Sequence, residues 1–353
     1  MSRRVLVVRL DSVGDVLLSG PAVRAVAAHA TVDLLASPTG APAARLLPGV
    51  RRVHEWDCPW IGNPARPVTA AVIEELHAIV ADARPDEVVI LTSFHQSPLP
   101  LALQLRLAGV ERVTGASVDY AGSLLDVRLR PGEDFPESQS EVTRALTIAS
   151  AAGYELPAGD DGRLAVQPVP NAEPLAGPGQ YVVVHPGAAV PARSWPVGQH
   201  VAVVQALVDA GVRVVVTGSV AERGATARVA GGIALDLGGG TDLPALAGVL
   251  ASADAVVVGN TGAAHLAAAV GTPVVSLFSP VVDEVCWRPY GVPTILLGRT
   301  DTECAGTRAR ECPVPGHPCL ADIEPASVVE ALLAIRKLPS AEHSELRPEA
   351  VPA

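Results

Sequence analysis

The chain has 353 residues, of which 49% are hydrophobic and 18% are charged. This length favours two domains, and the composition is typical of a globular protein rather than a disordered one. The net charge of -11, from 37 acidic and 26 basic residues, argues against nucleic-acid binding through a basic patch. It also leaves at most a peripheral association with an anionic membrane.

The N-terminus begins with two arginines and the apolar run VLVV, but it does not continue as a signal sequence. Arg9, Asp11 and Asp15 interrupt the run, and no stretch approaches the roughly 20 apolar residues of a spanning helix. We therefore expect a cytoplasmic protein. Five cysteines, an odd number in a long chain, do not predict a disulfide scaffold.

The first element is a short apolar run, Val5 to Leu10, which predicts a strand. It ends in the turn DSVGD, after which the apolar residues of 16–29 recur at helical spacing. The pattern predicts further strands at 31–37, 51–56, 86–94 and 111–117, and a helix at 70–83. Strands that alternate with helices indicate a parallel sheet.

The interval from Leu156 to Gln180 is rich in Pro, Gly, Asp and Ala, lacks periodicity and is typical of an interdomain linker. The alternation then restarts. Strands are expected at 181–187, 212–219, 234–240, 253–262 and 273–280, and helices at 200–211, 221–232 and 325–337.

The sequence thus predicts an α/β fold of two doubly wound, Rossmann-like domains facing a central cleft. The predicted domains are residues 1–165 and residues 166–337. A tail at 338–353 is expected to be disordered.

Asp15 is the first candidate for chemistry. Gly14 before it permits a sharp turn, which places the carboxylate at the start of a helix and at the edge of the cleft. A helix cap explains the same spacing equally well, because Asp is a favoured capping residue.

The loop HPGAAVPARSWP in the second half suits a diphosphate. It contains His185 and Gly187 and then presents Arg193 and Ser194, so that backbone amides, a hydroxyl and a guanidinium share one loop. Taken alone, an arginine in a surface loop is more often simply solvated.

The segment VVVGNTGAAH runs from a strand into Asn260, Thr261 and Gly262 and then into a helix. Exposed amides at a helix start form an anion site, to which His265 could donate. The segment is not a dinucleotide fingerprint, because GxGxxG does not occur here. A partly buried helical histidine is the alternative for His265.

Two further segments could receive a nucleoside. Thr217 and Gly218 end one strand, and Thr241 and Leu243 lie in 237–254, where small residues would let a base and a ribose approach the backbone. Glu222 could accept hydrogen bonds from ribose hydroxyls, although a solvated Glu at a helix start is the more ordinary interpretation.

In this order and spacing, the motifs resemble glycosyltransferase family 9, the ADP-heptose heptosyltransferases of lipopolysaccharide core assembly. The shared features are the opening strand with GD, the HPG…RxWP loop, the TGS…E turn, the NTG…H…GTP block and the WxPYG segment at Trp287 to Gly291. They span Val5 to about Leu320.

The resemblance implies a GT-B fold whose N-terminal half binds the acceptor and whose C-terminal half binds a nucleotide-diphosphate sugar, ADP-linked in the family. Asp15 would be the base that deprotonates an acceptor hydroxyl, with inversion at the anomeric carbon. Arg193 would stabilise the leaving diphosphate without a metal or another cofactor. The other implied contacts are Thr261, Gly262 and His265 to phosphate and Glu222 to ribose.

One position departs from the family's pattern. Asn260 replaces the Asp that commonly precedes the TG pair; an amide can bond sugar hydroxyls but removes a charge, so the donor sugar need not be heptose. The chain also lacks a basic patch for a phosphorylated lipopolysaccharide. The expected acceptor is a glycan, a glycolipid or a metabolite.

Cys304, Cys312, His317 and Cys319 offer the ligand types of a tetrahedral zinc site. Their spacing contains no CxxC pair, which favours a loop with free thiols, and no metal enters the expected mechanism.

Two other functions fit part of the pattern. A non-hydrolysing sugar-nucleotide epimerase shares the architecture and the diphosphate site, but it needs acid and base groups that act on the sugar itself. A catalytically silent binding protein could also retain the fold. Asp15 favours the transferase over the epimerase. The presence of Asp15, Arg193 and His265 argues against the catalytically silent binding protein.

Overall fold

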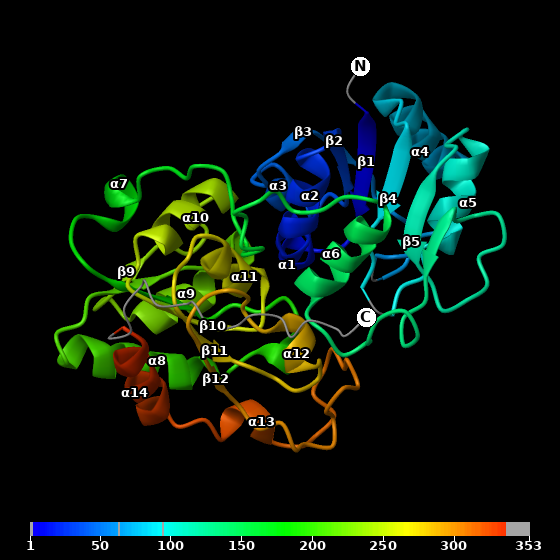
Figure 1. Ribbon diagram of the computed structural model, residues 1–353. Coiled ribbons are helices and arrows are strands. Elements are labelled where there is room, and N and C mark those ends of the chain that lie inside the picture. The colour runs from blue at the N-terminus through cyan, green and yellow to red at the C-terminus, as the bar shows by residue number, and fades with distance from the viewer. Residues whose placement is uncertain (1–2, 63, 94, 337–353) are drawn as a thin grey trace.

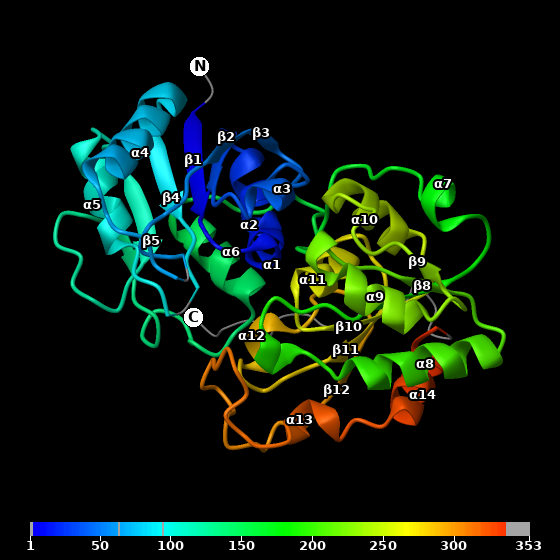
Figure 2. The same ribbon diagram turned by 180° about the vertical axis from the view of Figure 1, so that it is seen from behind.

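The computed structural model describes residues 3–62, 64–93 and 95–336. The predicted tail at 338–353, and residues 94 and 337 of two predicted elements, lie outside these ranges. Two six-stranded parallel sheets, each flanked by helices, form two halves that lie side by side (Figures 1 and 2). This arrangement confirms the predicted α/β fold.

The first sheet has the order β3-β2-β1-β4-β5-β6. Its strands are β1 Arg4–Arg9, β2 Thr31–Ala36, β3 Val50–Glu55, β4 Glu87–Ile90, β5 Val113–Ala116 and β6 Val127–Leu129. The helices of this half are α1 Val13–Leu18, α2 Gly20–Ala27, α3 Ala41–Ala44, α4 Ala70–Ala83, α5 Leu99–Leu107 and α6 Glu141–Ala151. All but the first residue of β1 are buried, because helices cover both faces of a parallel sheet.

The second sheet has the order β12-β11-β10-β7-β8-β9. Its strands are β7 Val182–His185, β8 Val214–Val216, β9 Leu235–Asp236, β10 Val256–Gly259, β11 Val274–Leu277 and β12 Thr294–Leu297. Its helices are α7 Glu173–Ala176, α8 Val197–Asp209, α9 Arg223–Ala230, α10 Leu243–Ala251, α11 Gly262–Ala269, α12 Glu284–Trp287, α13 Pro318–Ala321 and α14 Pro325–Ile335, with short turns η1 Pro191–Arg193 and η2 Val220–Glu222.

Both sheets have the same topology. Each chain half starts at a central strand, winds outward, crosses back and winds outward on the other side, so the order reverses between β1 and β4 and between β7 and β10. Doubly wound sheets bind ligands at the carboxyl ends of the strands beside such a reversal. The strand order alone therefore predicts one ligand-binding crevice in each half.

The prediction missed several elements. The edge strands β6 and β12 are short and only half-buried, so their pattern is weak. The single helix predicted at 16–29 is two helices, because Pro21 in the first turn of α2 has no N–H to continue the ladder of α1. The Ser19 hydroxyl instead donates to the Val16 carbonyl at 2.7 Å.

The two halves meet through α1 and α11, which pack against each other. Glycines make this approach possible: a Cβ added to Gly14 would lie 2.7 Å from Cδ2 of His265, and one added to Gly262 would lie 3.2 Å from Cγ1 of Val13. One apolar cluster continues from the first sheet into the second. The halves are therefore held close at the point where the crevices open.

The linker predicted at 156–180 contains the short helix α7 and no strand among its residues. It is fastened to the first half, where the Gln167 amide donates to the Leu46 carbonyl at 2.7 Å. The domain boundary at 165/166 stays a prediction. None of the helices in the described ranges has the length and hydropathy to cross a membrane.

Candidate active site

A cavity of about 320 Å³ lies between the carboxyl ends of the two sheets. The first half contributes Asp11, Ser12, Gly14, Asp15, Ile61, Ser93, His95 and Gln96, and the second contributes Arg193, Asn260, Thr261, Gly262, His265, Val282, Trp287 and Arg308. Most of these residues follow β1, β4, β7 and β10, the four strands that flank the reversals of strand order. The cavity is thus where the topology places a ligand.

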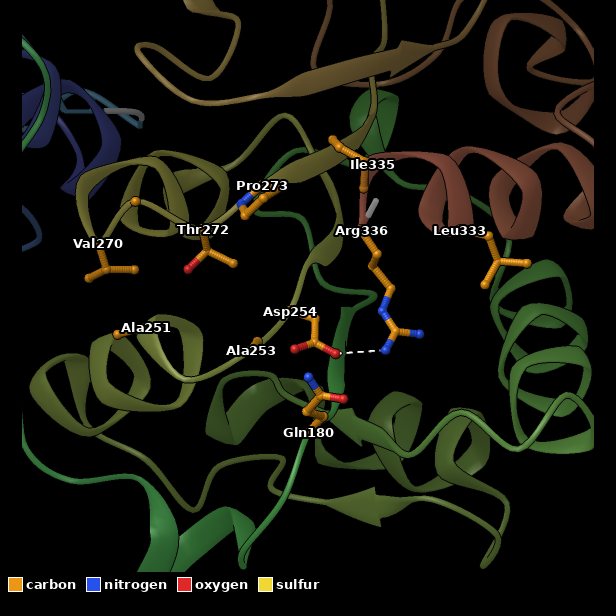
Figure 3. A pocket seen from close by; sticks show the side chains of 11 residues that line it. Gln180, Ala251, Ala253, Asp254, Val270, Thr272, Pro273, Leu333, Ile335 and Arg336 are labelled. Carbon is orange, nitrogen blue, oxygen red and sulfur yellow. Dashed lines mark hydrogen bonds and ion pairs between the residues drawn. The ribbon is translucent and has the colours of Figure 1, made fainter. Parts of the chain in front are cut away.

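A larger hollow of about 510 Å³ lies elsewhere (Figure 3). Gln180, Asp254 and Pro273 in its wall precede β7, β10 and β11, so it is at the amino ends of the strands. Its main polar contact is the ion pair between Arg336 and Asp254, at 2.7 Å. This hollow is at the wrong edge of the sheet for the ligand site of a doubly wound fold.

Asp15 completes the capping box of α1, whose N-cap is Ser12, and it also lines the cavity. Its Oδ2 accepts hydrogen bonds from the Ser12 amide at 3.2 Å and the Ser12 hydroxyl at 2.6 Å, and its Oδ1 is 3.3 Å from Nη2 of Arg9. Burial alone would raise the pKa of Asp15, but Arg9, the Ser12 bonds and His265 together lower it. The capping interpretation and the cavity-facing interpretation are therefore both correct, and the carboxylate is ionised at neutral pH.

Arg9 is the centre of a buried charge cluster that the sequence did not reveal. Its side chain is 2% exposed and lies within 3.3 Å of carboxylate oxygens of Asp11, Asp15 and Glu141. Glu141 comes from the start of α6, far along the chain. One guanidinium thus faces three carboxylates, which raise the pKa of Arg9 despite the opposing effect of burial.

Asp11 is the second carboxylate of the first half that lines the cavity. Burial raises its pKa to about 6, with the charge of Asp15 adding to the shift and Arg9 opposing it. Its Oδ1 accepts a hydrogen bond from the Gln96 amide group. Asp11 and Asp15 are four residues apart, yet the pKa of Asp11 is raised and that of Asp15 is lowered.

The second half contributes polar atoms that lack a protein partner. Asn260 and His265 are each only 5% exposed. The side-chain atoms without a hydrogen-bond partner among the described residues include Asn260 Oδ1 and Nδ2, Thr261 Oγ1, His265 Nδ1 and Arg193 Nε. Because a buried polar group without a partner is costly, such a cluster beside one cavity indicates a polar ligand.

Two features of the second half favour an anionic ligand, namely the start of α11 and the His265 side chain. Thr261 and Gly262 begin α11, whose free amides and dipole favour negative charge. Burial lowers the pKa of His265 to about 4, although Asp15 opposes the shift. The imidazole is neutral at pH 7 and can still donate one N–H.

His185, Gly187, Thr217, Gly218 and Glu222 form a second group at and after the ends of β7 and β8, outside the lining of the cavity. His185 Nδ1 is 2.9 Å from Thr217 Oγ1, and the Ser219 amide donates to Glu222 at 2.7 Å. A Cβ on Gly187 would overlap the Glu222 carboxylate, and one on Gly218 would meet Thr226. These glycines allow close packing between the two loops.

The predicted site residues therefore divide into those that line the cavity and those that do not. The first set is Gly14, Asp15, Arg193, Asn260, Thr261, Gly262 and His265. The second set is His185, Gly187, Ser194, Thr217, Gly218, Glu222, Thr241 and Leu243. Thr241 and Leu243 flank Asp242, the cap of α10. The roles assigned to both sets stay predictions.

Cys304, Cys312 and Cys319 carry free thiols. His317 Nε2 is 3.1 Å from the Ala192 carbonyl. Within the described ranges, no group of three or more His, Cys, Asp or Glu side chains is arranged to hold a metal ion.

Two facing Rossmann-like halves with a polar cavity between them form a GT-B fold. The sequence profile of glycosyltransferase family 9 (heptosyltransferase) matches residues 102–317, so the chain belongs to this family and is a glycosyltransferase. A comparison with curated proteins found no match.

Solved structures agree with the fold. A family 9 glycosyltransferase from Veillonella parvula superposes with a TM-score of 0.75 at 16% identity, over 95% of this chain and 97% of that one. The ADP-heptose lipopolysaccharide heptosyltransferase II of E. coli gives 0.72 at 23% identity, over 94% and 98%. The E. coli heptosyltransferase WaaC with ADP gives 0.68 at 20% identity, over 94% and 99%.

Proposed function

We propose that this glycosyltransferase moves a sugar from an ADP-linked donor to a hydroxyl of a glycan, glycolipid or metabolite, with inversion and without a metal. The observation that carries the proposal is the opposition of charges across one cavity. The ionised Asp15 faces Arg193 and the unpartnered polar atoms at the start of α11. The adenine base is proposed from the donor and ligand named for the two E. coli relatives.

In the proposed reaction, an acceptor hydroxyl attacks the anomeric carbon from the face opposite the diphosphate. A new carbon–oxygen bond forms as the bond to the diphosphate breaks, and the hydroxyl proton passes to the Asp15 carboxylate. Asp15 retains free lone pairs for this proton, since each oxygen of an ionised carboxylate accepts more than one hydrogen bond.

The electron pair of the broken bond passes to the departing diphosphate. Its charge is met by the Arg193 guanidinium, by the neutral His265 as a donor and by the amides of Thr261 and Gly262. Asn260 is positioned beside them to bond hydroxyls of the donor sugar, and Glu222 with the β8 loop is proposed to receive the ribose.

Calorimetric titration with ADP-, GDP-, UDP- and dTDP-sugars tests the donor. We expect the ADP-sugar to bind most tightly, and tighter binding of another base would overturn the adenine assignment. Conversion of the donor sugar into its epimer without any acceptor would instead favour an epimerase.

The variant Asp15→Asn tests the base. We expect donor binding to persist and the rate of transfer to the best acceptor to fall by about 10²- to 10⁴-fold, because an amide cannot accept the proton. Asp209→Asn, an exposed change on α8, is the matched control. Undiminished transfer by Asp15→Asn would show that another group is the base.

A further inference from the structure

The irregular segment 298–317 joins β12 to α13 and contains Cys304 and Cys312; we call it the cysteine segment. Hydrogen bonds hold it against the wall of the active site. The Gly306 amide donates to the Pro280 carbonyl at 2.8 Å, and the Arg308 amide donates to the Val281 carbonyl at 2.7 Å. The Ala192 amide donates to the Arg310 carbonyl at 2.9 Å. The last contact joins this segment directly to η1, the turn that carries Arg193.

The buried cysteine of this segment explains how it is held. Cys304 is 1% exposed and packs in a small apolar cluster with Ala192 and Val281. Its thiol thus fills a gap between η1 and the loop after β11, as a small apolar residue would. These contacts hold the cysteine segment against η1 and the loop after β11. They therefore also fix the position of any residue of the segment that lines the cavity.

That residue is Arg308. Its φ angle is 61°, a left-handed conformation that residues other than glycine seldom adopt and that is common at functional sites. Its side chain lines the cavity, where Nη2 lies 2.7 Å from Nε2 of His95. Arg308 thus reaches from the second half to the first, across the cavity.

Arg308 and Arg193 bring two positive charges to one small space. Burial lowers the pKa of Arg193; the charge of Asp15 opposes this shift, and the charges of Arg308 and Arg310 add to it. Burial also lowers the pKa of Arg308, and the negative charges of Asp15 and Glu141 oppose this shift. Two guanidinium groups that repel each other at a cavity wall suit a ligand with more than one negative charge.

We propose that Arg308 is a second diphosphate-binding residue, which holds the terminal phosphate of the leaving nucleotide beside Arg193. This inference rests on the proposed function and adds a residue that no motif of the sequence indicated. In this proposal the cysteine segment places the Arg308 guanidinium in the same cavity as Asp15.

Calorimetry with ADP and AMP tests the proposal, because the two nucleotides differ by the terminal phosphate. For Arg308→Gln we expect ADP affinity to fall by about 10- to 100-fold, the usual effect of losing a charged hydrogen bond. AMP affinity should change by less than about 3-fold, which also shows that the variant is folded. Arg308→Lys, which keeps the charge but not the fork, should lose less ADP affinity.

Arg299→Gln is the matched control, because it makes the same charge change in the same segment at an exposed position that does not line the cavity. The only ion-pair partners of Arg299 among the described residues are Asp301 and Asp322. Unchanged ADP affinity in Arg308→Gln would overturn the inference, and so would an equal loss in Arg299→Gln. Equal losses of ADP and AMP affinity would also overturn it. A wild-type chain that binds no nucleoside diphosphate would refute the proposed function itself.

Discussion

Replacing Gly14 by alanine tests whether the two halves meet as closely as the structure shows. A Cβ at this position would lie 2.7 Å from Cδ2 of His265, about 0.7 Å short of ordinary contact, and 3.4 Å from the Gly262 backbone. Neither neighbour can yield easily, because His265 is 5% exposed and Gly262 begins α11. The strain should cost about 1–3 kcal/mol, offset by up to about 1 kcal/mol of helix propensity in α1.

We therefore expect Gly14→Ala to lower the melting temperature by a few degrees and to weaken ADP binding by about tenfold. Differential scanning calorimetry and titration calorimetry measure the two effects. Gly198→Ala in α8 is the control, since nothing lies within 4 Å of its Cβ position; it should be neutral or stabilising. A Gly14→Ala chain as stable as the wild type, with unchanged ADP affinity, would refute the close contact of α1 and α11.

The buried charge cluster gives two further predictions, both measured by urea denaturation. The pKa of Asp11 in the folded protein is about 6, above the usual 3.8. Ionisation of Asp11 therefore destabilises the folded protein, and this penalty develops as pH rises from about 4 to 6 and is complete above 6. Asp11→Asn should stabilise the protein by about 1–3 kcal/mol at pH 8 and little at pH 4. An equal gain at both pH values would contradict this. Arg9→Met leaves three carboxylates without their cation and should cost about 3–5 kcal/mol at pH 7, with a smaller loss in acid; an unchanged urea midpoint would show that Arg9 does not neutralise them.

Much of the fold follows from local pattern. Apolar runs such as Val5 to Leu10 are typical of strands buried on both faces of a parallel sheet, and loops such as HPG and NTG end strands at the edge where ligands bind. The same reasoning failed at β6 and β12, because an edge strand of three or four half-buried residues has almost no pattern of its own.

The sequence by itself determined the fold class, the family and the residues whose chemistry is local, namely Asp15 after its glycine and the NTG start of α11. Only the tertiary structure decided which charged and buried groups surround these residues and shift their pKa values. Glu141 and Arg308 reach the cavity from α6 and from the cysteine segment, 132 residues from Arg9 and 213 from His95. Charge and burial act through space, so no periodicity or spacing along the chain could show that Arg9 would face three carboxylates or that two arginines would share one cavity.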